Sequence, residues 1–300
     1  YALTYAPTMA LANSIAFDHL QGTGKSFSAI RVFGTIGWII AGISIDKVFK
    51  IPPSAMGTTF TMAGTASILL AILSVTIPKK MVAEISGALA GSRVIGKDVW
   101  VLFKNRSFTI FFIASILICI PLSFYYSLAN QFFNETGLHN ATSKMTLGQF
   151  SEAVFIVMIP FFLKRWGIKW MIIIGMLAWI TRFLFFRYGD AGSNSWMLIA
   201  GILLHGVCFD FFFVTGQVYT DSIASDSNRN AAQGIITMAT YGVGMCIGSL
   251  LAGYLAKRAT IGANSHHWEM VWLVPIGITV AVLVFFAIFF QRKQPGMVQS

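Results

Sequence analysis

IGWIIAGISIDK (residues 36–47) and IGSLLAGYLAKR (residues 247–258) carry the same pattern of glycine, alanine and terminal base. The segments that precede them also match, NSIA at 13–16 and DSIA at 221–224, at nearly the same separation along the chain. Two adjacent matches at nearly the same separation indicate an internal repeat. The matching positions within the longer pair are Gly37 and Gly248, Ala41 and Ala252, Gly42 and Gly253, and Lys47 and Arg258.

Hydrophobic residues make up 56% of the 300 residues and charged residues only 11%, whereas an average soluble domain is about 25% charged. The composition therefore excludes a water-soluble domain and indicates a polytopic membrane protein. A membrane-spanning helix needs about 20 mostly apolar residues. Nine stretches meet this requirement: 1–19, 27–49, 56–78, 108–132, 145–163, 168–187, 195–220, 230–256 and 268–291.

The repeat relates the first and second of these spans to the seventh and eighth, so the repeating unit is six helices. The fold predicted is all-α, with a 6+6 repeat of the major facilitator type, whose two halves enclose a site near the middle of the membrane. Residues 108–300 are then a complete C-terminal bundle with a tail, and 1–78 the last three helices of the N-terminal bundle. Three earlier helices are expected upstream, and 79–107 is expected to link the bundles.

The basic segment 79–107 also predicts the orientation. Lysine and arginine accumulate in the cytoplasmic loops of membrane proteins, and placing 79–107 in the cytoplasm puts most of the lysines and arginines on that side. The C-terminus is then cytoplasmic as well. The net charge of +10 is explained by this bias, so it does not indicate a nucleic-acid partner.

Two carboxylates lie inside apolar spans, Glu152 and Asp210. Ionisable residues at membrane depth are costly, and they typically face a bundle interior or a water-filled cavity on a substrate, ion or proton path. These two residues are therefore the first candidates for function. A purely structural alternative stays open, in which either acid pairs with Arg31 or Arg182. Arg182 itself is expected to extend to the membrane surface, one turn from Arg187.

Five segments of the spans carry recognisable motifs. They are YAPTMALANSIAF (5–17), IRVFGTIGWIIAG (30–42), FSEAVFIVMIPFFLKRWGIKWMIIIGMLAWITRFLFF (150–186), CFDFFFVTGQVY (208–219) and NAAQGIITMATYGVG (230–244). In these segments, and over nearly its whole length, the chain resembles the bacterial nucleoside:proton symporter family. The resemblance implies a carrier rather than an enzyme, which takes up nucleosides with protons across the inner membrane. It implies no cofactor, a lipid surrounding and a functional monomer.

The resemblance assigns Arg31, Thr35 and Trp38 to the wall of the central cavity. Their spacings of four and three place them on one helix face, where they offer a donor, a hydroxyl and an aromatic plane. Gln149 and Glu152, three residues apart, match the polar segment of another helix. A nucleoside needs a flat apolar slot for its base and polar partners for its base edges and ribose hydroxyls, which these side chain types supply.

Phe209 and Asp210 match the family's phenylalanine–aspartate pair. We expect Phe209 to line the substrate site and Asp210 to be the main proton carrier, with Glu152 as a substrate ligand that can also take part in coupling. Burial disfavours an ionised carboxylate, which lets such a group load and release protons. Coupling further requires that substrate affinity differ between the two protonation states.

Three expected substrate-facing positions depart from the family pattern. Ser123 and Tyr126 stand where some members have glutamine and asparagine, and His205 stands where some have tyrosine. The preference for purine or pyrimidine nucleosides therefore does not follow from the resemblance. Two alternatives to a nucleoside carrier remain, a carrier of the same fold for a sugar or other small polar solute and a non-transporting sensor of the same fold. For residue 205, the alternative is a histidine that is merely packed. No H-E-x-x-H or G-x-S-x-G motif indicates an intramembrane enzyme.

Overall fold

The computed structural model describes residues 8, 12, 24–51, 55, 57–76, 97–225, 228–262 and 265–291. Most of the first predicted span (1–19) and of the linker (79–107) lies outside the described residues. Apart from a two-stranded antiparallel ribbon of β1 (Thr260–Gly262) and β2 (Ser265–His266), the regular structure is helical. The predicted all-helical class is thus confirmed except for this ribbon.

Most of the helices correspond to predicted spans. The elements are α2 (Gly24–Ile43) with η1 (Ser44–Val48), α3 (Gly57–Ser74), α5 (Lys97–Leu102), α6 (Arg106–Glu135), α7 (Ala141–Tyr188), α8 (Ser195–Leu203), α9 (His205–Phe209), η3 (Asp210–Val214), α10 (Thr215–Ile223), α11 (Arg229–Thr237), η4 (Met238–Gly244), α12 (Met245–Arg258) and α13 (Trp268–Phe289). The η elements are π-helical turns, and they continue the helices that flank them.

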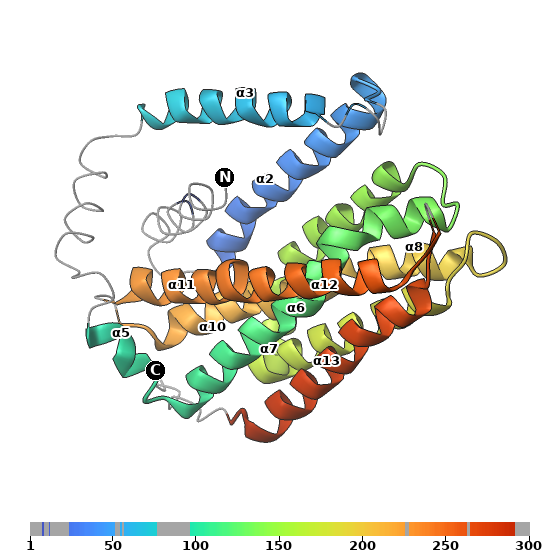
Figure 1. The fold of residues 1–300 in the computed structure, drawn as a ribbon. Helices are drawn as coiled ribbons and strands as arrows, with labels where there is room; N and C mark the ends of the chain where they lie inside the picture. Colours follow the sequence, from blue (N-terminus) through green and yellow to red (C-terminus); the bar gives the residue numbers. More distant parts are fainter. Residues whose placement is uncertain are drawn as a thin grey trace.

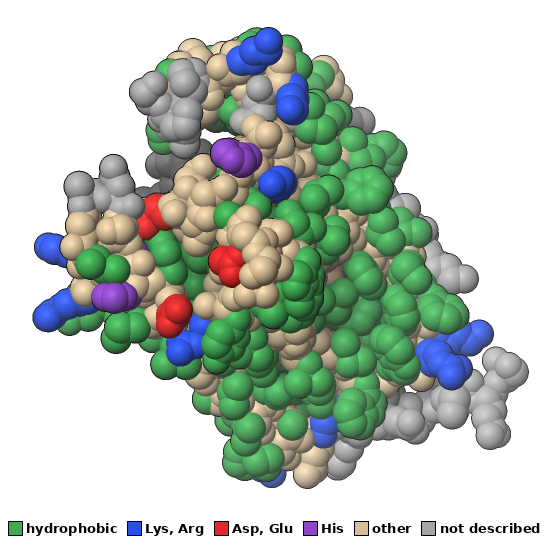
Figure 2. Space-filling model, turned by 90° about the vertical axis from the view of Figure 1, so that its right-hand side faces the viewer, with side chains coloured by type: hydrophobic (Ala, Val, Ile, Leu, Met, Phe, Trp, Pro, Cys, Tyr) green, Lys and Arg blue, Asp and Glu red, His purple; other side chains and the backbone are tan. Residues whose placement is uncertain are grey.

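Within the described residues, six helical stretches are long and apolar enough to cross a membrane. They are Gly57–Ser74, Arg106–Glu135, Ala141–Tyr188, Ser195–Ile223, Ala231–Arg258 and Trp268–Phe289. The count of nine spans and the three upstream helices stay predictions. Hydrophobic side chains cover a broad face of the molecule, with many of the charged side chains around its margins (Figure 2), as expected where lipid tails are the solvent.

Element α7 holds two helices that meet at a kink at Gly167 and correspond to two predicted spans. It runs for 48 residues, and its backbone leaves the helical region at Gly167, where φ is 72° and ψ is 171°. Residues with a side chain rarely adopt a positive φ, whereas glycine adopts it readily. Gly167 therefore turns the chain between the two predicted spans, 145–163 and 168–187, with no non-helical residue besides itself.

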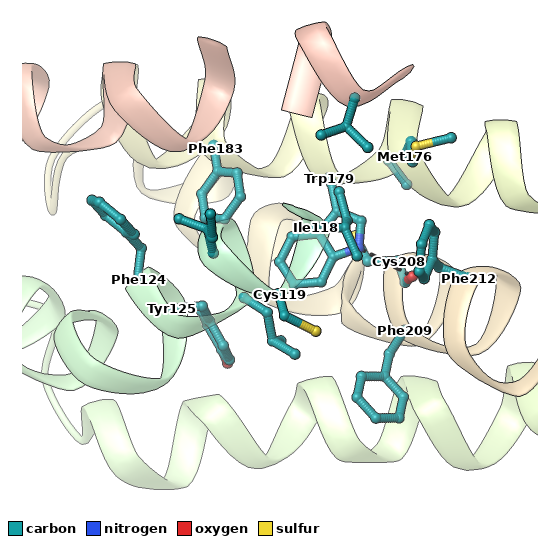
Figure 3. Packing of buried hydrophobic residues seen from close by; sticks show 14 of the residues in the cluster. Ile118, Cys119, Phe124, Tyr125, Met176, Trp179, Phe183, Cys208, Phe209 and Phe212 are labelled. Atoms are coloured by element: carbon teal, nitrogen blue, oxygen red, sulfur yellow. Dashed lines mark hydrogen bonds between the residues drawn. The ribbon is translucent and has the colours of Figure 1, made fainter. Parts of the chain in front are cut away.

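The core is formed by the helices from α6 to α13. Figure 3 shows Ile118 and Cys119 of α6, Trp179 of α7 and Cys208 of α9 meeting in one layer, with Tyr125 and Phe209 pointing to the same side of it. Trp179 is fully buried, and its indole N–H donates to the carbonyl of Cys208 at 3.2 Å. A buried tryptophan is stabilised when its N–H finds an acceptor, so this bond fixes α9 against α7.

Helix α9 approaches the first half of α7 very closely. A Cβ placed on Gly206 would lie 2.5 Å from the backbone carbon of Ser151, so only glycine fits there. The Ser151 hydroxyl donates to the carbonyl of Leu203 at 2.6 Å. His205 directly precedes Gly206, and Glu152 directly follows Ser151. These contacts therefore bring His205 and Glu152 to the same level of the bundle.

Helix α2 packs along the first half of α7. A Cβ on Gly42 would lie 3.0 Å from the Thr146 methyl group, and Val32 packs against a small apolar cluster that includes Ile156 and Ile159. Helix α3 lies apart from the α6–α13 bundle (Figure 1) and has no buried residue. Of these two N-terminal helices, α2 is thus the one whose contacts with the C-terminal bundle are described.

Candidate functional site

A chain of four polar side chains crosses the contact between α2 and the C-terminal bundle. The Thr35 hydroxyl of α2 donates to Oε1 of Glu152 in α7 at 3.1 Å. The other carboxylate oxygen of Glu152, Oε2, lies 3.6 Å from Nε2 of His205 in α9. Nδ1 of His205 lies 2.9 Å from Nη1 of Arg182 in the second half of α7. Polar groups from three helices thus meet in an otherwise apolar interior.

Burial differs along this chain. The side chains of His205 and Arg182 are 1% and 0% exposed, and Thr35 is 6% exposed, whereas the Glu152 side chain keeps 14% of its surface accessible. Glu152 is therefore the charged member that a solute could reach. Electrostatic interactions are stronger in such a low-dielectric setting than in water, so the carboxylate is a strong acceptor for hydroxyl and amide groups.

Aromatic rings enclose the inner end of the chain. The guanidinium of Arg182 lies 3.6 Å above the centre of the Tyr125 ring, in a cation–π contact. The ring of His205 stacks on Tyr125 at 5.5 Å and lies 5.6 Å from that of Phe209. The buried cation is thus held by an aromatic face on one side and an imidazole nitrogen on another.

The expectation that Arg182 extends to the membrane surface is wrong, because its side chain is completely buried. The position of Arg182 about one helical turn before Arg187 suggested a surface stripe, but the helix turns Arg182 inward, next to Trp179 and Phe186. The available sequence signal was the aromatic setting of this arginine in WITRFLFF (179–186). Tyr125, which supplies the ring, carried no comparable signal in the sequence.

The predicted phenylalanine–aspartate pair lies just beyond the histidine. Phe209 ends α9 and is 4% exposed, and Asp210, fully buried, begins the π-helical turn η3. Such turns often occur at functional sites. The structure therefore places the buried acid five residues along the chain from the histidine that approaches Glu152.

The remaining predicted ligands of α7 and α2 are placed differently. Gln149 is 8% exposed and lies one helical turn before Glu152. Trp38, one turn after Thr35, is 58% exposed, so most of its ring is uncovered. Arg31 belongs to α2, but its side chain lies outside the described residues. Of the three residues predicted for this face of α2, Thr35 is thus the one whose contact with the chain of polar groups is described.

The two predicted positions of α6 separate. Ser123 is fully buried where α6 packs on α12, and its hydroxyl donates to the carbonyls of Cys119 and Met245 at 3.0 and 3.1 Å. It therefore bonds within the helix contact and not with the polar chain. Tyr126 is 41% exposed, and its ring lies 5.7 Å from that of Tyr125.

Among the described residues, no three His, Cys, Asp or Glu side chains gather where they could hold a metal ion. The groups that do gather are hydrogen-bond donors and acceptors with flat aromatic rings beside them. Such an arrangement can bind a polar, ring-containing solute, and it can exchange a proton at a carboxylate.

Comparison with known proteins also indicates a transporter. A family model described as "Nucleoside H+ symporter" matches residues 1–295. The chain is 37% identical to the putative nucleoside transporter YegT of Escherichia coli K12, covering 98% of this chain and 71% of the relative. It is 32% identical to the xanthosine permease of the same organism, covering 95% and 71%.

A solved structure agrees with the sequence relatives. The crystal structure of the nucleoside transporter NupG matches with a TM-score of 0.73 and 31% identity, covering 96% of this chain and 74% of that one. The relatives are transporters and not enzymes, and their similarity together with the apolar helices makes this a multi-pass protein of the bacterial inner membrane. The chain belongs to the nucleoside H+ symporter family.

Proposed function

We propose that this protein takes up nucleosides together with protons, and that it does so by alternating access between two pseudo-symmetric bundles. The family match over residues 1–295 and the names of the relatives support this function. The single structural observation that carries the proposal is the carboxylate of Glu152, which is bound by Thr35 of α2 and still partly accessible. A solute that engages this carboxylate would contact both sides of the α2–α7 interface.

Glu152 acts in this proposal as a substrate ligand. Its oxygens accept hydrogen bonds from hydroxyl or amino groups of the nucleoside, and Gln149, one turn away on the same face, adds an amide. The carboxylate also contributes to coupling, because its charge state changes its strength as an acceptor. Arg31, Thr35 and His205 complete the proposed set of polar ligands.

Asp210 acts as the main proton carrier. It is fully buried within an apolar span, and a carboxylate at membrane depth typically marks an ion or proton path. The base of the nucleoside is proposed to stack on Phe209, Trp38 and Tyr126. Base–aromatic stacking accepts any base, because every base has a π-face.

The proposed cellular setting follows the sequence analysis. The protein functions as a monomer in the lipid bilayer, with its C-terminus in the cytoplasm and without a cofactor or a nucleic-acid partner. The two halves are 1–78, with helices that precede it, and 108–300, joined by 79–107.

The experiment is uptake into proteoliposomes that contain the purified full-length transporter. Radiolabelled uridine and adenosine should accumulate when the outside is more acidic than the inside, and a protonophore should abolish the accumulation. An excess of unlabelled nucleoside should compete, whereas a hexose should not. Competition by the hexose with no effect of either nucleoside would replace this proposal by a sugar carrier.

A further inference from the structure

The buried pair of Arg182 and His205 determines where the proton sits on the imidazole. Nη1 of Arg182 lies 2.9 Å from Nδ1 of His205. A guanidinium can only donate hydrogen bonds, and it stays charged in proteins. Nδ1 must therefore be the acceptor and carry no proton. In a neutral imidazole the other nitrogen then bears the hydrogen, so Nε2–H points toward Oε2 of Glu152, 3.6 Å away.

A second proton on this imidazole is strongly opposed. It would have to occupy Nδ1, where it would meet a donor N–H, and it would place two cations in contact in a buried site. The titratable and charged groups that face His205 among the described residues are Arg182 and Glu152 of α7 and the phenol of Tyr125 in α6. The carboxylate of Glu152 favours protonation of the imidazole, whereas burial and the adjacent positive charge of Arg182 oppose it.

The imidazole of His205 accepts the hydrogen bond of the Arg182 Nη1 group, and the polar side chains of Tyr125 and Cys208 also lie near the guanidinium. The Nε and Nη2 atoms of Arg182 are buried and have no hydrogen-bond partner among the described residues. The Tyr125 ring covers the guanidinium face at 3.6 Å. A buried cation with unsatisfied donors is costly, so a role in holding His205 accounts for its presence better than stability does.

We infer that Arg182 is a positioning residue that keeps His205 neutral, as a fixed donor aimed at Glu152, and so keeps His205 off the proton path. In this arrangement the imidazole is a bridge between a permanent cation and the substrate-facing carboxylate. It orders Glu152 without changing charge during transport. Proton exchange is then left to the carboxylates. The role of His205 in transport rests on the proposed function, but the position of the hydrogen on its imidazole can be tested without measuring transport.

The direct test is nitrogen NMR of the full-length transporter in lipid, labelled at histidine, with the His205 signals assigned by their loss in His205→Gln. The inference predicts one neutral state with the hydrogen on Nε2, unchanged between about pH 5 and 8, the range in which ordinary histidines titrate. A His205 that titrates in this range, or that carries its hydrogen on Nδ1, overturns the inference whether or not the protein transports nucleosides.

Three variants connect this state to transport. In Arg182→Met, His205 should begin to titrate and the uptake-versus-pH profile should gain a new step, and Arg182→Lys should restore the wild-type profile because it returns a buried donor and charge. His205→Gln keeps an acceptor for Arg182 and a donor for Glu152. It should raise KM severalfold while proton-driven accumulation keeps its wild-type pH profile. Loss of accumulation with exchange intact in His205→Gln would make His205 a proton carrier and contradict the inference.

Discussion

Thr35 and Glu152 are joined by a hydrogen bond of 3.1 Å across 117 positions of the chain. The two residues lie in α2 and α7, which the internal repeat predicts to belong to different halves of the molecule. A carboxylate bound in this way responds to events on both sides of the interface. A change in its protonation or in its ligand therefore has a direct route to the packing of α2 on α7.

Replacing Thr35 with valine removes this hydroxyl and keeps the side chain shape. A hydrogen bond to a charged group contributes about 1.5–3 kcal/mol, and about 1.4 kcal/mol corresponds to a tenfold change in affinity. We expect Thr35→Val to weaken nucleoside binding about tenfold, measured by equilibrium binding of labelled uridine. Thr35→Ser, which keeps a hydroxyl, is the matched control and should bind within a few-fold of the wild type. If the valine variant and the wild type bound uridine with equal affinity, the hydrogen bond from Thr35 to Glu152 would not contribute to nucleoside binding.

Gly206→Ala tests the close approach that brings His205 to Glu152. The added Cβ would lie 2.5–2.7 Å from backbone atoms of Ser151 and Glu152, which cannot yield as a flexible side chain does. Overpacking of this kind costs about 1–3 kcal/mol, so thermal unfolding in detergent should occur several degrees lower. Gly277→Ala in α13, where a Cβ would meet nothing within 4 Å, should leave the melting temperature nearly unchanged. The packing account fails if both variants melt alike.

Glu135 binds three side chains at the end of α6 that lies beside the β-ribbon. It accepts from the amide of Gln131 at 2.9 Å and from the indole N–H of Trp268 at 2.9 Å, and its oxygens lie 3.0 Å from Nδ1 of His266. The carboxylate thus ties α6 to the β-ribbon and to the start of α13.

Glu135→Gln should destabilise this end of the bundle. The amide places an N–H₂ group against a donor, and leaving a buried polar group unsatisfied costs about 1–3 kcal/mol. We expect a lower melting temperature and faster proteolysis of the 259–267 segment. Glu269→Gln, at an exposed position in the first turn of α13, is the control and should behave as the wild type. Unchanged protease sensitivity in Glu135→Gln would show that the ribbon is held by other contacts.

Much of the fold could be predicted from apolar length alone, because a helix that crosses a bilayer must satisfy its own backbone. The spans over α6, α8–α10 and α13 were predicted nearly to their ends. The break between the spans 145–163 and 168–187 was predicted as well, because the basic segment LKRWGIK (163–169) indicated a short turn, and the backbone leaves the helical region there at Gly167. That a single residue makes this turn could not be predicted, because composition gives no information on local φ and ψ.

The site could be predicted in part. Glu152 and Asp210 could be predicted because ionisable side chains are rare in membrane-spanning segments. Thr35 could be predicted because it belongs to a motif that the chain shares with the family. Arg182 was misplaced, since the direction in which a helix faces within a bundle depends on tertiary packing. The partners of His205 could not be inferred either, because two other helices, α6 and α7, supply them.

Proton-driven accumulation by Asp210→Asn tests the central claim most directly. The variant keeps the size of the buried side chain and removes its ability to carry a proton. In proteoliposomes with an acidic exterior, we predict that it exchanges labelled for unlabelled uridine but does not concentrate it, whereas the wild type does both. Accumulation by the variant to the wild-type level would contradict the account, because the buried acid at 210 would then play no part in coupling.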